Sequence, residues 1–185
     1  MNKRKNVFSI FLQKKFQVAF LLAIGIGIAI AVGTSTVAEK TNTTEFCTSC
    51  HSMQWVTAEW KESYHYKNAS GVRAECADCH VPHSLGPKLY AKVIAAKDVW
   101  GEITGSINTK EKFEKHRWTM ANRVWEKMRA TNSRECQSCH AFEFMNTSEQ
   151  AKFSRKKHLK AQKQGQTCID CHKGIAHEEP ENPDA

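Results

Sequence analysis

The chain has 185 residues, which is room for one ordinary domain and a membrane anchor. Its formal net charge of +8 would be compatible with a nucleic-acid partner, but much of the surplus is local. Five of the 27 basic residues precede residue 18, so the rest of the chain carries 22 basic residues against 19 acidic ones. So small a surplus gives no reason to expect a nucleic-acid partner.

The N-terminal region carries an apolar run that is long enough to cross a membrane. Residues 18–38 contain no charged side chain, and a spanning helix needs about 20 such residues. The basic residues within 1–17 favour a cytoplasmic N-terminus and an exported remainder. A cleaved secretory signal is the alternative, because residues 36–38 form a small-x-small site, but the run exceeds the usual signal core of about 7–15 residues. We therefore expect a single-pass anchor in the cell inner membrane, with residues 39–185 in the periplasm.

All eight cysteines fall into four copies of Cys-x-x-Cys-His, the attachment motif of c-type haem. The two thiols bond covalently to the haem, and the adjacent histidine binds its iron. A zinc knuckle or a disulfide framework would not place a histidine directly after every second cysteine. The sequence therefore predicts four covalently bound c-type haems. Their attachment residues are Cys47, Cys50, Cys76, Cys79, Cys136, Cys139, Cys168 and Cys171, and their proximal ligands are His51, His80, His140 and His172.

The spacing of the motifs divides the exported part into two di-haem halves, residues 39–86 and 132–178. The middle segment, residues 87–131, is rich in Ala, Lys, Glu, Met and Arg and is predicted to be helical, with breaks at Gly101 and Gly105. So short a chain cannot cover four haems with an independent apolar core, so the porphyrins themselves must supply much of it. We expect a mainly α fold with long irregular connections. The acidic tail from residue 178 is predicted to fray.

Four histidines outside the motifs recur at similar positions in the two halves, which indicates an internal duplication and a second axial ligand for each iron. A fifth, His116, has no counterpart and is predicted to be a solvated helix residue. Met53 lies two residues after the first motif, where its thioether either binds the first iron in place of His51 or packs on the porphyrin. The four predicted distal ligands are His65, His83, His158 and His177.

The chain resembles the NapC/NirT family of membrane-anchored tetrahaem quinol dehydrogenases, and within it the NapC branch, which supplies electrons to periplasmic nitrate reductase. The resemblance covers nearly the whole chain, and four stretches carry it, residues 44–53, 70–76, 79–83 and 168–177. It implies the four distal histidines named above, and Met53 rather than His51 as ligand of the first haem. It also implies that Lys92 and Asp98 bind membrane quinol, either menaquinol or ubiquinol, beside that haem.

Three other functions would use some of the same features. A terminal multihaem reductase needs an open iron for its substrate, and the chain has histidines for nearly every axial position. An electron-storage or relay cytochrome needs the anchor and the haems but no quinol-oxidising activity. A donor to a nitrite or trimethylamine N-oxide reductase differs only in its partner.

Overall fold

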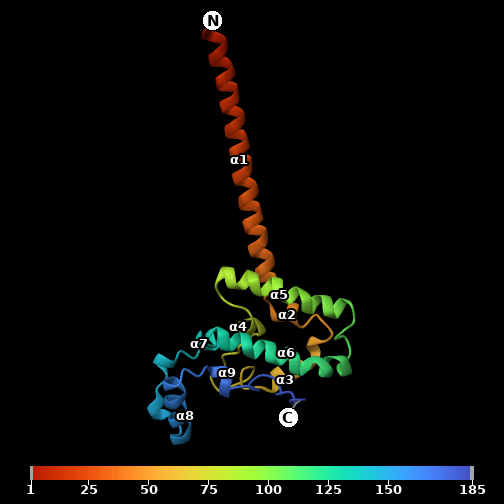
Figure 1. Ribbon diagram of the computed structural model, residues 1–185, viewed down its shortest axis with the longest axis vertical. Helices are drawn as coiled ribbons and strands as arrows, with labels where there is room; N and C mark the ends of the chain where they lie inside the picture. The colour runs from red at the N-terminus through yellow and green to blue at the C-terminus, as the bar shows by residue number, and fades with distance from the viewer. Residues whose placement is uncertain (1, 184–185) are drawn as a thin grey trace. The chain divides into compact units, whose positions relative to one another are not determined.

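The computed structural model describes residues 2–183, and the surroundings of their side chains from residue 13 onward. The chain divides into two compact units, Met1–Thr41 and Asn42–Ala185. The first is formed by helix α1 (Asn2–Lys40), drawn in red to orange in Figure 1. Within it, Gln13–Lys40 has a mean hydropathy of 2.3 over its most apolar 18 residues, none of which is buried. By length and composition this segment can cross a membrane.

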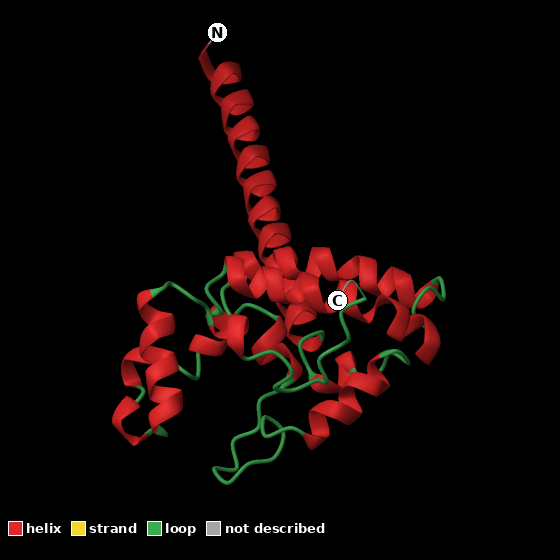
Figure 2. Ribbon diagram, turned by 60° about the horizontal axis from the view of Figure 1, so that its bottom comes forward, coloured by secondary structure: helices red, strands yellow, loops and turns green. Residues whose placement is uncertain are grey.

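The second unit is built from helices and irregular connections, and Figure 2 shows no strand among the described residues. The mainly α fold is thereby confirmed. Two short 3-10 turns, Phe142–Phe144 and Thr147–Glu149, accompany the helices. The helices are α2 (Thr44–Cys47), α3 (Met53–Glu62), α4 (Cys76–His80), α5 (Leu85–Ile103), α6 (Lys110–Ala130), α7 (Arg134–Gln137), α8 (Lys152–Lys163) and α9 (Cys168–Cys171).

The predicted helical middle segment is present as α5 and α6, but only one of the two glycines divides it. Gly105 has a positive φ of 74°, which other residues rarely adopt, and follows the last turn of α5. Gly101 lies inside α5, where a Cβ would come within 3.0 Å of the Ser106 hydroxyl oxygen. The Ser106 N–H donates to the Gly101 carbonyl at 2.9 Å, so Gly101 allows the chain to fold back closely instead of ending the helix.

The second and fourth haem motifs begin on helices that are capped in the same way. The Asp78 carboxylate accepts the Glu75 N–H at 2.8 Å, and the Asp170 carboxylate accepts the Thr167 N–H at 2.8 Å. Each aspartate is the third residue of a Cys-x-Asp-Cys-His motif and completes a capping box, so the sequence of the motif itself fixes the start of α4 and α9.

The first and third motifs have a serine in place of this aspartate and a different local structure. Ser49 donates from its hydroxyl to the Phe46 carbonyl at 2.7 Å, and Ser138 donates to the Glu135 carbonyl at 2.6 Å. Helices α2 and α7 accordingly begin before the first cysteine of the motif rather than at it. This alternation of serine and aspartate motifs is what a duplicated di-haem unit predicts.

Helix α6 runs through the middle of the second unit and packs on α9 (Figure 1). Trp125 and Met128 of α6 form the buried cluster with Ile169 of α9. Ser133, which is fully buried, accepts the Ile169 N–H at 3.2 Å and adopts a left-handed conformation with φ of 50°. Few other apolar side chains are buried, so the core that the protein itself supplies is small, as predicted.

Candidate functional site

The four haem motifs lie next to one another in chain order. Helix α2 contacts α4, and α4 contacts α7. Cys47 of the first motif and Cys76 of the second are close enough for their side chains to act on each other. Cys79 is close enough to Cys136 for their charges to interact, and Cys136 interacts with Cys168 in the same way. The structure therefore arranges the attachment sites as a series, first to fourth.

Three of the four predicted distal histidines face a motif histidine. The ring centroids of His65 and His140 are 6.3 Å apart, which pairs a first-half histidine with the third motif. The separation for His80 and His177 is 6.2 Å, and for His158 and His172 it is 5.9 Å. The pairing thus crosses between the halves for the second and third motifs and stays local for the fourth.

These separations are what one iron atom held between two imidazoles requires. A metal–imidazole bond is about 2.0–2.1 Å long and the ring centroid lies roughly 1.2 Å behind the nitrogen, so two such rings have centroids about 6.4 Å apart. None of the eight cysteines is in a disulfide, and each pair of facing rings includes the histidine that completes a Cys-x-x-Cys-His motif. The residues present therefore fit c-type haems with two histidine ligands at the second, third and fourth motifs.

Polar groups lie behind two of these histidines, one of them within hydrogen-bond distance. His158 Nδ1 lies 2.8 Å from the side-chain oxygen of Gln150, which precedes α8. His177 Nδ1 lies 4.0 Å from Glu59 Oε2 on α3. A hydrogen bond to the second ring nitrogen, as from Gln150 to His158, fixes the tautomer of a metal-binding histidine and its orientation. Neither Gln150 nor Glu59 belongs to a motif, and no sequence signal identified them.

The first motif differs from the other three. The His51 ring packs edge-on against Trp55 at 5.8 Å, and the ring contacts of the described residues pair it with no second histidine. Met53 is partly buried at the start of α3, two residues further on. A thioether next to the attachment site, with no imidazole opposite, suits a weakly ligated iron, the arrangement that the family resemblance implies for the first haem.

Met53→Leu is expected to change the spectrum of one haem only. A weakly ligated iron is expected to be high-spin, and the three irons with two histidine ligands are expected to be low-spin. Leucine keeps the size of the side chain but removes the sulfur, so the high-spin signal of the first haem should change while the low-spin signals stay. Electron paramagnetic resonance of the full-length protein in detergent measures both. An unchanged high-spin signal would return Met53 to a packing role and leave His51 as the ligand.

The two remaining histidines are on the surface. His83 is exposed and faces no other histidine among the described ring contacts, so its assignment as a distal ligand stays a prediction. His116 is also exposed, and its Nδ1 lies 2.8 Å from the Lys112 carbonyl within the same helix. This is the solvated helix position predicted for it.

Helix α5 carries both predicted quinol-site residues and is tied to the first motif. Glu102, one turn after Asp98, accepts the backbone N–H groups of His51 at 3.0 Å and of Ser52 at 3.4 Å through Oε1. Its other oxygen, Oε2, is buried without a hydrogen-bond partner. Glu102 therefore holds the first motif against α5, a role that no pattern in the sequence indicated.

Lys92 and Asp98 occupy different surroundings on this helix. The charge of Lys92 acts on the Cys47 thiol, where it lowers the pKa against the stronger effects of Cys76 and burial, so Lys92 lies near the first attachment site. Asp98 is about half exposed and forms an ion pair with Arg123 of α6 at 3.3 Å. An ion pair this exposed is weak, so the Asp98 carboxylate stays accessible to a ligand or a proton.

Known proteins that are similar to this chain are c-type cytochromes. The model of the NapC/NirT cytochrome c family, N-terminal region, matches residues 11–182. A tetrahaem c-type cytochrome of Allochromatium vinosum is 60% identical over 144 residues, which are 78% of each chain. NapC of Escherichia coli K12 is 53% identical over 150 residues, 80% of this chain and 75% of NapC. TorY of Haemophilus influenzae is 49% identical over 164 residues, 89% of this chain but only 45% of TorY.

The family match covers nearly the whole chain, and the eight motif cysteines and the apolar helix α1 are those of a membrane-anchored cytochrome. The chain therefore belongs to the NapC/NirT family: it is a single-pass membrane protein that binds c-type haems covalently and transfers electrons from quinol to a periplasmic reductase.

Proposed function

We propose that the chain oxidises menaquinol or ubiquinol beside the first haem, with Lys92 and Asp98 as the quinol-binding residues. The haem domain lies in the periplasm, and its electrons go to a periplasmic nitrate reductase. One observation carries the quinol site: α5 holds both residues and is joined to the first motif through Glu102 and the His51 N–H. In this proposal quinol is oxidised at the first of four attachment sites, and the contacts between these sites support their order in a series.

Quinol oxidation releases two protons as well as two electrons. Two side chains of α5 suit the acceptance of a proton and the stabilisation of the negative charge that develops on the quinol. A carboxylate near a quinol hydroxyl can accept its proton, which is the role proposed for Asp98. A lysine ammonium can bind the other oxygen and stabilise the negative charge that develops there, the role proposed for Lys92. The bound haems supply one-electron transfer, while the protein sets their positions and potentials.

The outer face of α5 favours access by a lipid-soluble donor. Val93, Trp100 and Ile103 lie along one side of the helix and are 71%, 66% and 72% exposed. Asp98 and Glu102 point instead to α6 and to the first motif. A helix that exposes its apolar face, with a tryptophan on it, is typical of contact with a membrane interface, from which quinol would enter.

The far end of the series suits an acidic protein partner. Helix α8 supplies His158, which faces the fourth motif, and carries six basic residues and no acidic one. A positive surface next to the last attachment site would steer a negatively charged reductase or its cytochrome subunit to the haem from which electrons leave. The similarity to NapC supports nitrate reductase as that partner.

Proteoliposomes that contain the full chain test this function. Reduction of the haems by a menaquinol analogue is expected, followed by reoxidation when a periplasmic nitrate reductase and nitrate are added. Reoxidation only by a nitrite or trimethylamine N-oxide reductase would replace the proposed partner. A protein that dithionite reduces but no quinol reduces would be an electron-storage cytochrome.

The protein extracted from membranes is expected to keep its N-terminus and to carry four haems. The expectation rests on the apolar helix and on the four complete motifs. Intact mass spectrometry should give the mass of the full chain plus four haems. A chain that begins at Glu39 would show that the helix is a cleaved signal, and a mass with three haems would show that one motif is not used.

A further inference from the structure

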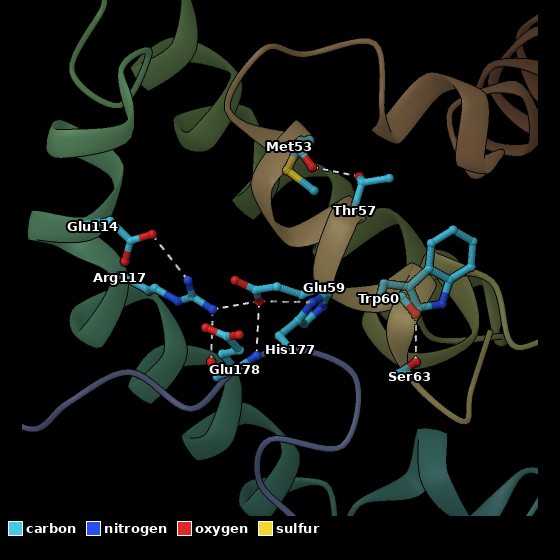
Figure 3. A network of polar contacts seen from close by, with 9 residues as sticks. All are labelled: Met53, Thr57, Glu59, Trp60, Ser63, Glu114, Arg117, His177 and Glu178. Atoms are coloured by element: carbon cyan, nitrogen blue, oxygen red, sulfur yellow. Dashed lines mark hydrogen bonds and ion pairs between the residues drawn. The ribbon is translucent and has the colours of Figure 1, made fainter. Parts of the chain in front are cut away.

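One carboxylate oxygen joins three segments that are far apart in the sequence (Figure 3). Glu59 Oε2 on α3 accepts Arg117 Nη2 of α6 at 2.6 Å and the backbone N–H of Glu178 at 3.0 Å. Arg117 Nη2 also donates to the Glu178 carbonyl at 2.9 Å. The pair therefore holds the backbone of Glu178 from both sides, and the predicted fraying of the tail is wrong at this residue.

This ion pair is largely removed from solvent. The Arg117 and Glu59 side chains are only 11% and 15% exposed, whereas Glu114, the second carboxylate that Arg117 contacts, is 41% exposed. Burial by itself lowers the pKa of Arg117, but the hydrogen bond and the charge of Glu59 outweigh it and raise the pKa overall. The charged Arg117 guanidinium and the Glu59 carboxylate therefore interact in surroundings where charges act more strongly than at the surface.

The network lies directly behind a predicted haem ligand. His177 precedes Glu178, and its Nδ1, buried without a hydrogen-bond partner, is 4.0 Å from the same Glu59 oxygen. The His177 ring faces His80 of the second motif at 6.2 Å. Helix α3 begins at Met53, beside the first motif, and Glu59 lies further along it (Figure 3). The same helix thus reaches from the first attachment site to the distal ligand of the second.

We propose that Glu59 and Arg117 are positioning residues for the second haem, which hold His177 in place and together set the reduction potential of that haem. The proposal rests on the pairing of His80 with His177 put forward above. Glu59 fixes the chain at Glu178, next to His177, and its negative charge lies 4.0 Å from the second ring nitrogen of His177, where it acts on the ring electrostatically.

Opposite charges at one place give the pair a testable electrostatic signature. A negative charge near the iron stabilises the oxidised state, so its removal raises the potential, and removal of the positive charge lowers it. Because the two charges largely cancel, the native pair keeps the second haem near the potential of its histidine ligands. The second haem is next in the series, so its potential affects electron transfer from the first haem.

Glu59→Gln keeps the shape of the side chain and removes its charge, and Arg117→Gln removes the opposite charge. We expect Glu59→Gln to raise the potential of one haem and Arg117→Gln to lower it. Each shift should be about 59 mV, which for one electron is a tenfold change in the ratio of oxidised to reduced haem. In the double variant the potential of this haem should be close to that of the parental protein. The same is expected of Arg117→Lys, which keeps the positive charge. Spectroscopic redox titration of the full-length protein with a chemical reductant measures all four without any quinol.

Glu114→Gln is the matched control, because it removes the exposed carboxylate of the same arginine and should shift no potential. His177→Ala identifies the haem concerned, since it should abolish one low-spin signal, and Glu59→Ala should broaden or weaken that same signal. If His177→Ala leaves every low-spin signal intact, the proposed ligand pairing fails.

Two results would overturn the role of Glu59 and Arg117 even where the pairing holds. One is a shift in Glu59→Gln no larger than that of Glu114→Gln. The other is a shift of the same sign in Glu59→Gln and Arg117→Gln, which would show loss of structure rather than loss of charge. If Arg117→Gln alone does not retain its haems, the difference in potential between Glu59→Gln and the double variant still gives the sign of the effect of the Arg117 charge.

Discussion

Asp98→Asn is expected to slow haem reduction by a menaquinol analogue about 10²–10⁴-fold, the usual effect of losing a positioned general base. Asparagine has the same shape as aspartate but cannot accept the quinol proton. The measurement is the initial rate of haem reduction in proteoliposomes, with dithionite reduction as the control for intact haems. A parental rate in Asp98→Asn with a matching dithionite spectrum would remove Asp98 from the quinol site.

The structure supplies a control that separates the base from its ion pair. Arg123→Gln breaks the 3.3 Å contact with Asp98 but leaves the carboxylate in place. If proton acceptance is the role of Asp98, Arg123→Gln should keep most of the parental rate. Equal losses in the two variants would show instead that the contact between α5 and α6 is what matters, and Asp98 would then have a structural role.

Lys92→Ala completes this prediction on the same helix. Removal of one group that stabilises a developing negative charge typically costs about 10²–10³-fold in rate. Lys97→Ala, also a lysine-to-alanine change on α5 but at an exposed position, should leave the rate unchanged. A rate loss of similar size in both variants would show that Lys92 acts only through the overall charge of the helix, without a specific role in the quinol site.

His158→Ala is expected to abolish one low-spin haem signal and to stop electron transfer from the protein to its reductase. The His158 ring faces His172 at 5.9 Å, so alanine would leave the fourth iron with one histidine. Quinol should still reduce the other haems, because the first three attachment sites are unaffected. Electron paramagnetic resonance and reoxidation by the added reductase measure the two effects separately.

His83→Ala and His116→Ala are the matched controls for this prediction. Both residues are exposed, and neither faces a motif histidine among the described ring contacts. Their variants should keep the low-spin signals of the three histidine-paired haems. Loss of one of these signals in His83→Ala would make His83 a distal ligand and would contradict one of the three pairs.

Several features of this protein could be predicted from local sequence because they depend on neighbouring residues alone. Haem attachment needs two thiols and an imidazole within five residues, so each Cys-x-x-Cys-His motif identifies its own site. A membrane-spanning helix satisfies its backbone hydrogen bonds internally, so a run of about 20 apolar residues is enough to identify it. The break at Gly105 follows likewise from the left-handed conformation that one glycine permits.

The sequence also limited the distal ligands to a few histidines, but it could not pair them. Spacing suggested two similar halves, whereas the structure pairs His65 of the first half with the third motif and His177 of the second half with the second motif. These pairs join residues 75 and 97 positions apart in the sequence. Which imidazoles meet is decided by long-range packing, such as that of α4 on α7 and of α6 on α9, and no local pattern encodes that packing.

The residues that orient the site were found only in the tertiary structure. Glu59, Glu102 and Arg117 are charged residues on helices, and in the sequence each is indistinguishable from a solvated helix position. Their roles depend on contacts that folding makes between distant residues. Glu102 is 51 residues from His51, and Glu59 is 58 residues from Arg117. The chemistry of this protein is therefore fixed by short motifs, whereas its ligand pairs and the charges behind them depend on long-range contacts that only the folded chain contains.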